Sequence, residues 1–281
     1  MGLLAEMAEY MAAMGLGYVA GRFLGLRVPS FVFTAVVVAV IFSASAEGAR
    51  VIVGNAGYIV ALSLGYALSA ALASLLPFAL LSRGRGASQA AGSKVSIVAV
   101  SALLAGIAVG YFFQAPYASA IGPILVVLLF LAGADIGRLR GLAIGPRLIA
   151  VPLASLASSL AVGLVFYLWL GVSPAVAAGM GWYSFTGPFL LSASGNAVLG
   201  ALGFLANFFR EQLTFVLTPL LASRIPPDAA LAVGGATTMD NTLPLYRSIY
   251  GAEAVVPAVV NGVVLTVAVP IVVPLVYKLF P

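Results

Sequence analysis

Cysteine and histidine are both absent from the 281-residue chain, and charged residues make up only 7% of it. Without cysteine there is no disulfide and no thiol nucleophile. Without histidine there is no histidine-ligated zinc site and no serine–histidine catalytic pair. A soluble domain of this length would carry about 25% charged residues. The chain is instead 63% hydrophobic, which predicts an all-α polytopic membrane protein whose surroundings are the lipid bilayer.

Long apolar runs organise the whole chain. A helix needs about 20 apolar residues to cross the hydrocarbon core, and the sequence predicts about ten such segments within one membrane domain over 1–281. They lie at 5–25, 31–46, 51–81, 95–113, 119–137, 147–170, 174–191, 195–222, 229–247 and 254–279. Over 178–225 the pattern fits either two crossings or one re-entrant hairpin.

The basic residues indicate topology. The net charge of +5 does not suggest a nucleic-acid partner, because the basic residues stand at the ends of apolar runs. The loops after the first, third and fifth segments carry Arg22, Arg27, Arg83, Arg85, Lys94, Arg138, Arg140 and Arg147. The loops between them carry Arg50 alone. The odd-numbered loops are therefore predicted to be cytoplasmic, with both termini outside a multi-pass cell-membrane protein. No basic residue precedes Arg22, so the N-terminus does not resemble a cleavable signal peptide.

An internal repeat connects two parts of the chain. Phe42–Arg50 aligns without a gap on Phe130–Arg138, which lies 88 residues later. With one residue of slippage, the upstream glycines that align are Gly17 and Gly21 with Gly106 and Gly110. Three predicted crossings separate the copies, so the copies near 10–83 and 99–171 would enter the membrane with opposite hands. This is the inverted-topology repeat of many secondary transporters. Coincidence in a sequence rich in alanine, glycine and leucine is the alternative.

Glu211 lies inside an apolar run, where an acid at the helix centre costs about 2.5–3.5 kcal/mol. Asn207, Arg210 and Glu211 share one face of a helix, and Thr214 and Thr218 continue the same stripe. A single polar stripe on an apolar helix predicts that this face lines the polar interior of the bundle. The alternative is a structural role in which Arg210 neutralises an acid on a neighbouring helix.

Asp240 is the second acid within an apolar run, in the segment Gly234–Pro244. Its paired glycines and its proline predict a broken helix. Thr237, Thr238 and Asn241 place hydroxyls and an amide beside the carboxylate. Broken helices in membranes expose carbonyls and amides that can hold an ion or a zwitterion. A buried kink whose polar residues satisfy its own backbone is the alternative.

A second break is predicted in Gly179–Pro188, which carries Tyr183, Ser184 and Thr186 between glycine and proline. Irregular backbone at membrane depth survives only when it is buried in protein or lines a cavity. These segments together predict a substrate site within 174–250. A glycine-mediated helix contact is the competing interpretation of this segment.

Asp135 and Glu47 are secondary candidates, because each precedes an arginine by three residues and a helix-end ion pair competes with a role in transport. In the absence of histidine, protons would have to travel on carboxylates. Asp135 and Asp240 could form the aspartyl dyad of an intramembrane enzyme, but no Tyr-Asp partner motif is present. The sequence therefore predicts no enzyme, no metal site and no cofactor.

Three motifs in order resemble the LysO-type lysine exporter family of prokaryotic inner-membrane proteins. The matching residues are Gly181–Ser184 with Gly187, Asn207 with Arg210 and Glu211, Gly235–Asp240 with Thr242–Pro244, and Leu128–Gly133. The resemblance is dense over about 120–281. It implies export of L-lysine with Glu211 and Asp240 as the functional pair, and kinship to the cation/proton antiporter and anion transporter fold group. The third loop is shorter and less charged than is usual in the family. This difference concerns the identity of the substrate and not the assignment as a transporter.

The chemistry of lysine is compatible with two separated acids. They could hold its two ammonium groups, while a helix N-terminus or Arg210 meets its carboxylate. The hypothesis is lysine/proton antiport with Glu211 and Asp240 shared by cation and proton. A sodium/proton antiporter, an exporter of arginine or ornithine, and a passive channel are the alternatives. Sodium as the coupling ion and a homodimer both stay open.

Overall fold

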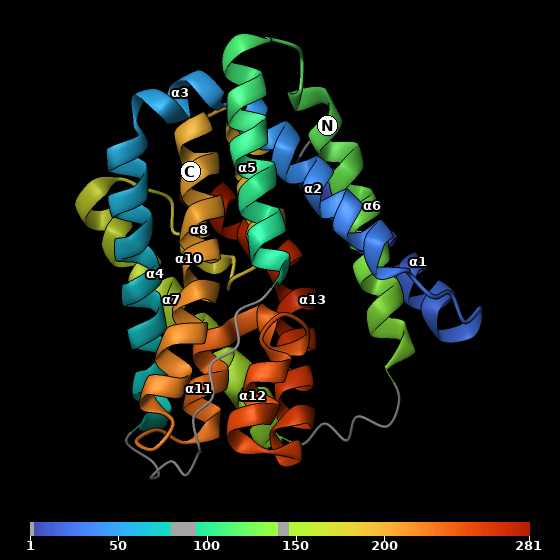
Figure 1. Ribbon diagram of the computed structural model, residues 1–281, viewed down its shortest axis with the longest axis vertical. Coiled ribbons are helices and arrows are strands. Elements are labelled where there is room, and N and C mark those ends of the chain that lie inside the picture. The colour runs from blue at the N-terminus through green and yellow to red at the C-terminus, as the bar shows by residue number, and fades with distance from the viewer. Residues whose placement is uncertain (1–2, 80–93, 140–145) are drawn as a thin grey trace. The chain divides into compact units, whose positions relative to one another are not determined.

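The computed structural model describes residues 3–79, 94–139 and 146–281, and within these ranges the protein is all-α with no strand (Figure 1). The predicted helical class is confirmed. The elements are α1 (Leu3–Phe23), α2 (Ser30–Glu47), α3 (Ala49–Gly54), α4 (Ala56–Ala79), α5 (Lys94–Phe112), α6 (Ala118–Arg138), α7 (Pro146–Leu170), α8 (Ala175–Ala178), α9 (Tyr183–Ser194), α10 (Ala197–Leu221), α11 (Pro227–Gly234), the 3-10 helix η1 (Gly235–Met239), α12 (Leu243–Tyr250), the 3-10 helix η2 (Ala252–Ala254) and α13 (Val255–Leu279).

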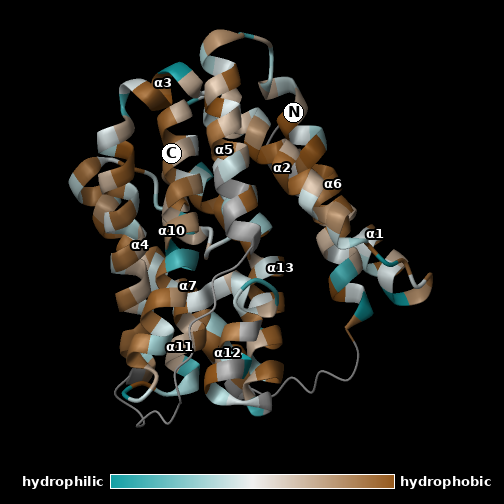
Figure 2. Ribbon diagram, viewed as in Figure 1, coloured by the Kyte–Doolittle hydropathy of each residue, from teal (hydrophilic) through white to brown (hydrophobic). Residues whose placement is uncertain are grey.

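Five of the described helices are long and apolar enough to cross a membrane: α2, α4, α6, α7 and α13. Hydrophobic residues cover most of the length of these helices, while a hydrophilic turn stands out partway along α10 (Figure 2). The predicted segments 119–137 and 254–279 match α6 and α13 to within one residue at each end. The number of ten crossings stays a prediction. So does the orientation of the termini, for which Arg83, Arg85 and Arg140 lie outside the described residues.

The chain divides into two compact units. Unit 1 comprises 1–59, 94–141 and 184–204, and unit 2 comprises 60–93, 142–183 and 205–281. The two predicted repeat copies divide between the units in the same way. In each copy the first two long helices belong to unit 1 and the third belongs mainly to unit 2.

Within unit 1, glycines bring two pairs of helices into backbone contact: α1 with α6, and α5 with α2 (Figure 1). A Cβ atom on Gly21 would stand 2.0 Å from the carbonyl oxygen of Ala134, and one on Gly110 would stand 2.0 Å from that of Ala46. One turn earlier, the contacts are Gly17 with Phe130 and Gly106 with Phe42. Small residues allow this approach in membrane helices, where dispersion contacts replace the hydrophobic effect. Residues that align in the predicted repeat thus make corresponding contacts.

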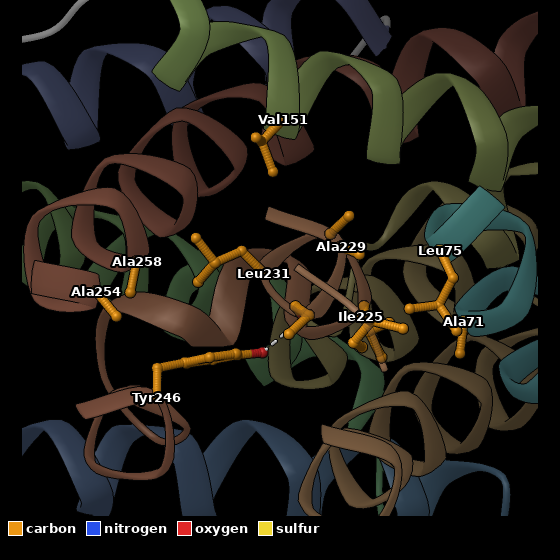
Figure 3. Packing of buried hydrophobic residues seen from close by; sticks show 12 residues of the cluster. Ala71, Leu75, Val151, Ile225, Ala229, Leu231, Tyr246, Ala254 and Ala258 are labelled. Atoms are coloured by element: carbon orange, nitrogen blue, oxygen red, sulfur yellow. Dashed lines mark hydrogen bonds between the residues drawn. The ribbon is translucent and has the colours of Figure 1, made fainter. Parts of the chain in front are cut away.

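Unit 2 is built around the short helix α11, which carries Asp228 in its first turn and is apolar and buried from Ala229 to Gly234. Residues Ala229–Val233 form the centre of its core (Figure 3). The surrounding side chains come from α4, α7, η2 and α13, and they include Ala71, Leu75, Val151, Ala254 and Ala258. The Tyr246 hydroxyl of α12 donates a 3.0 Å hydrogen bond to the Ala230 carbonyl. This packing fixes the end of α11, from which the candidate site begins.

Candidate functional site

The helix containing Asp240 is broken, as predicted. α11 ends at Gly234, and Gly235 takes φ +62°, a left-handed conformation that favours glycine. A 3-10 turn follows to Met239, and regular helix resumes only at Leu243. The backbone between the two half-helices therefore has carbonyl and amide groups without regular helical partners.

The other predicted break lies between α8 and α9. Met180 has φ +54° and Gly181 has φ +92°, so the chain leaves helical geometry there. A left-handed conformation at a non-glycine residue stores about 1–3 kcal/mol of strain and persists only where its surroundings impose it. Pro188 lies inside α9 and not at the break. Ser184 and Thr186 follow the break on α9, within unit 1, and both are buried.

The two breaks touch each other within unit 2. The amide of Ala236 donates a 2.9 Å hydrogen bond to the carbonyl of Met180. A Cβ atom on Gly235 would stand 2.2 Å from the same carbonyl oxygen. We call this contact of Met180 with Gly235 and Ala236 the helix crossing. It is a backbone-to-backbone contact, which a side chain at position 235 would prevent.

Asn207 on α10 holds the break beside Met180. Its Oδ1 accepts a 2.8 Å hydrogen bond from the Gly181 amide, and its Nδ2 donates a 2.9 Å bond to the Val176 carbonyl. The residue is buried. The amide side chain thus spans the gap between the end of α8 and the start of the irregular segment, and supplies the partners that a continuous helix would have provided.

Arg210 is buried in unit 2 with a relative exposure of 2%. Its Nε donates to the Val233 carbonyl at 3.0 Å, and one terminal nitrogen, Nη2, donates to the Ala232 carbonyl at 3.0 Å. The remaining contacts of the guanidinium are Ser74, Ser155, Ser159 and the Met180 sulfur. Among the described residues no carboxylate lies within 4.0 Å of it. Within the described part of the chain Arg210 therefore forms no ion pair with an acid, and backbone carbonyls and hydroxyls surround it instead.

The threonines of the second break are bonded to its own backbone. The Thr237 hydroxyl donates to the Gly234 carbonyl at 2.9 Å. The Thr238 hydroxyl reaches the carbonyls of Gly235 and Ala258, at 2.9 and 2.8 Å. They therefore stabilise the break, which is the role that the alternative interpretation of this segment gave them.

Asn261 on α13 was missed by sequence reasoning. Its Nδ2 lies 3.2 Å from the Leu231 carbonyl, 2.9 Å from the Gly235 carbonyl and 3.0 Å from the Thr238 hydroxyl oxygen. A lone amide inside the apolar run 254–279 was the available signal, since polar groups at membrane depth are costly. The serines around Arg210 had no comparable signal, because single serines are common in such helices.

Glu211 has a relative exposure of 0%, and its carboxylate meets the second break. Its Oε2 accepts a 2.8 Å hydrogen bond from the Asn241 side chain, and its Oε1 lies 3.4 Å from Nε2 of Gln212. The Tyr183 side chain lies near the same Asn241 and near both Glu211 and Asp240. Unit 2 thus gathers two carboxylates, one amide and one phenol.

The polar stripe of α10 faces inward, as predicted. Asn207, Arg210, Glu211, Thr214 and Thr218 are all buried, whereas Val216 and Leu220 on the other side are 58% and 68% exposed. A helical period of 3.6 residues accounts for this division.

Asp240 differs from Glu211, because it is exposed. An acid within an apolar membrane run is expected to turn away from lipid and into the protein, and Asp240 does not. The cause is local. With φ −135° and ψ −87° its backbone leaves the helical conformation at the end of η1, and the side chain bends back to accept a hydrogen bond from the Asn241 amide. The break itself therefore sets the direction of this carboxylate.

The two secondary candidates lie at helix ends in unit 1. Asp135 forms an i,i+3 ion pair with Arg138 at 3.9 Å. Glu47 accepts a 2.8 Å hydrogen bond from the amide of Ala118, the first residue of α6. Each acid thus has a partner that is common at helix ends, a basic side chain for Asp135 and a free backbone amide for Glu47.

Among the described residues, no group of three His, Cys, Asp or Glu side chains could hold a metal ion.

Comparison with known proteins adds an independent finding. The model of the family described as "Lysine exporter LysO" matches residues 100–277, the part of the chain that contains both breaks and the polar stripe. The protein named Lysine exporter LysO from Escherichia coli (strain K12) is 36% identical over 142 residues, which are 48% of this chain and 46% of the relative. The chain thus spans about half the length of the curated relative it matches. No solved structure matches it. Because the family model covers more than half of the residues, the chain belongs to the LysO lysine exporter family.

Proposed function

We propose that this protein is a secondary active transporter of the cell membrane that exports L-lysine from the cytoplasm in exchange for protons. The observation that carries the proposal is the fully buried carboxylate of Glu211, hydrogen-bonded to Asn241 at the break between α11 and α12. An ionisable group is rare at such a position and usually marks an ion or proton path. Membership of a lysine exporter family supports transport over catalysis.

The geometry separates groups that hold the site from groups that can meet a substrate. Asn207 and Thr238 are bonded to the backbone of the two breaks. Glu211, Asp240 and Asn241 bring polar groups together at the second break, where the Asn241 side chain donates to the Glu211 carboxylate and the Asn241 backbone amide donates to the Asp240 carboxylate. We assign the two ammonium groups of lysine to the two carboxylates.

The lysine carboxylate needs a different partner from the one expected from sequence. Arg210 was a candidate for it, but its guanidinium is bonded to carbonyls and serines of unit 2. We assign the lysine carboxylate to backbone amides at the breaks, because such amides bind anionic groups in broken membrane helices. In this proposal Arg210 supports the site without touching the substrate.

The inward movement of protons offsets the electrical free energy that lysine export requires. Moving one positive charge out of a negative cytoplasm costs about 2.3 kcal/mol per 100 mV. One proton moving inward cancels that cost, and a second proton would add driving force. A carboxylate can bind either an ammonium or a proton, so Glu211 and Asp240 are suited to alternate between them. Each would release lysine when it is protonated on the outer side.

The glycine contacts of unit 1 support the predicted repeat, and with it kinship to the antiporter fold group. The contacts of Gly21 with Ala134 and of Gly110 with Ala46 relate α1–α6 to α5–α2, as the alignment of the two copies requires. Inverted repeats and broken helices occur together in secondary transporters. On this proposal the two copies are related by inversion across the membrane.

Radiolabelled counterflow in liposomes tests the function. Purified protein in vesicles preloaded with unlabelled lysine should accumulate labelled lysine, and an imposed pH gradient should drive net flux in the absence of counterflow. Arginine, ornithine and sodium assayed alongside measure specificity. Labelled lysine uptake no faster than in protein-free vesicles would reject the proposal. A lysine flux that does not change with the pH gradient would reject proton coupling and would favour a passive channel.

A further inference from the structure

The groups that contact the Arg210 guanidinium form a cage around it, and each of them acts as a hydrogen-bond acceptor. Two backbone carbonyls, Ala232 and Val233, stand at the C-terminal end of α11. The hydroxyls of Ser74 and Ser155 donate their protons elsewhere, to the carbonyls of Ala70 and Ala232, so their lone pairs are left for the guanidinium. The Ser159 hydroxyl oxygen lies 2.6 Å from Nη1, and the Met180 sulfur lies 3.7 Å from it.

Such a cage is a cation site by its chemistry. Carbonyl and hydroxyl oxygens are the ligands that hard cations prefer. The C-terminal end of a helix carries a partial negative charge, which a cation stabilises. An arginine remains protonated in proteins, and its five donors lie in a fixed plane that matches several acceptors at once. The cage draws these acceptors from α4, α7, α11 and the break at Met180.

The position of the cage connects it to the transport site. Met180 supplies the carbonyl of the helix crossing and also contacts the guanidinium through its sulfur. Glu211 follows Arg210 directly on α10, and its carboxylate bonds Asn241 beyond the crossing. The contacts of the Arg210 guanidinium therefore hold the helix crossing in place. They also determine the orientation in which Glu211 approaches the second break.

We propose that Arg210 is a resident cation of the helix crossing, occupying a built cation site so that no dissolved cation such as sodium binds there. Arg210 is then a positioning residue for Glu211 and Asn241, and lysine transport is independent of sodium. This inference rests on the proposed function only for its transport measurements, since occupation of the cage can be measured without transport.

Guanidinium rescue tests the cage directly. Arg210→Ala protein in detergent should melt several degrees below the parent, and millimolar guanidinium should restore most of the loss by binding the folded state. Equal concentrations of urea, which has the same shape without charge, and of sodium should not. An Arg210→Ala protein that keeps the parent's melting temperature, or that guanidinium fails to stabilise more than urea, would overturn the proposal. A variant that inserts only when guanidinium is present would support it.

Two buried serines on α4 provide a matched pair that leaves Arg210 in place. Ser74 contacts the guanidinium, whereas the buried hydroxyl of Ser63 has no hydrogen-bond partner among the described residues. Ser74→Ala should lower the maximal lysine flux several-fold and alter its pH profile, whereas Ser63→Ala should leave both unchanged. Equal effects of the two substitutions would show that the serine contacts are ordinary packing.

Sodium dependence separates this inference from the function itself. Lysine counterflow by the parent should have the same KM, within twofold, in sodium and in choline buffers. A tenfold higher KM without sodium would overturn the resident-cation proposal and leave lysine export intact. Absence of lysine flux in both buffers would reject the proposed function, and guanidinium rescue would still decide the cage.

Discussion

Asn241 Nδ2 donates a 2.8 Å hydrogen bond to Glu211 Oε2, which joins the acid of α10 to the break that precedes α12. The two residues are thirty positions apart in sequence. Because the carboxylate is fully buried, this amide is among the few groups that determine where its charge lies. Any movement of the break relative to α10 must first change this contact.

Removal of the Glu211 charge should stop transport without unfolding the protein. Glu211→Gln keeps the volume and can still bond Asn241, but it can neither bind an ammonium nor carry a proton. We expect lysine counterflow to fall at least about tenfold, equivalent to about 1.4 kcal/mol in the barrier. Glu9→Gln, at an exposed acid of α1, is the control and should retain the parent's rate. Full activity of Glu211→Gln in vesicles would contradict the assignment.

Gly235→Ala should destabilise the protein more than Gly251→Ala. Both glycines have positive φ, at +62° and +82°, so both substitutions carry backbone strain of about 1–2 kcal/mol. Only at Gly235 would the new Cβ stand 2.2 Å from a carbonyl oxygen, while nothing lies within 4 Å at Gly251. Melting temperatures in detergent should separate the two variants. Equal losses would mean that the helix crossing tolerates a side chain.

Asn207→Ala should leave two buried backbone groups without partners, the Gly181 amide and the Val176 carbonyl. Each unsatisfied group costs about 1–3 kcal/mol. The matched control is Asn196→Ala, which removes an exposed side chain that caps the start of α10 and should cost about 1 kcal/mol. Urea unfolding followed by circular dichroism would measure both. A smaller loss at Asn207 than at Asn196 would contradict its role at the break.

Gly21→Ala should weaken unit 1, whereas Gly15→Ala on the same helix should not. A Cβ on Gly21 would clash with the Ala134 carbonyl, while nothing lies within 4 Å of one on Gly15. In an open helical position alanine stabilises by about 1 kcal/mol relative to glycine. We therefore expect melting temperatures to shift in opposite directions. A parallel shift of both variants would show that α1 does not depend on close contact with α6.

The sequence alone was sufficient for the features that depend on local chemistry. Gly235 and Gly181 predicted breaks because left-handed backbone needs glycine, and both breaks are present. The inward face of α10 followed from its period, since Glu211 stands one turn after Asn207. In each case the deciding residues are neighbours in sequence.

Features that depend on tertiary contact could not be predicted in this way. Arg210 is surrounded by serines of α4 and α7, and no local pattern connects Ser74 with Ser155. The exposure of Asp240 depends on the dihedral angles of one residue after η1, which apolar periodicity does not specify. The hydrogen bond from Thr238 to the Ala258 carbonyl likewise could not be predicted, because it depends on where α13 lies.

The pairing of α1 with α6 has a consequence for how the chain is made. At ribosomal rates of about 5–20 residues per second, Gly21 leaves the ribosome on the order of ten seconds before Ala134, the residue it contacts. Throughout that interval the glycine face of α1 lacks the helix against which it packs. In the same way, α2 is synthesised before α5, the helix that it contacts. Unit 1 therefore cannot assemble helix by helix as the chain emerges. Its first helix reaches its final neighbour only after the described helices α2 to α5 have been synthesised, so insertion and packing are separate events in the life of the protein.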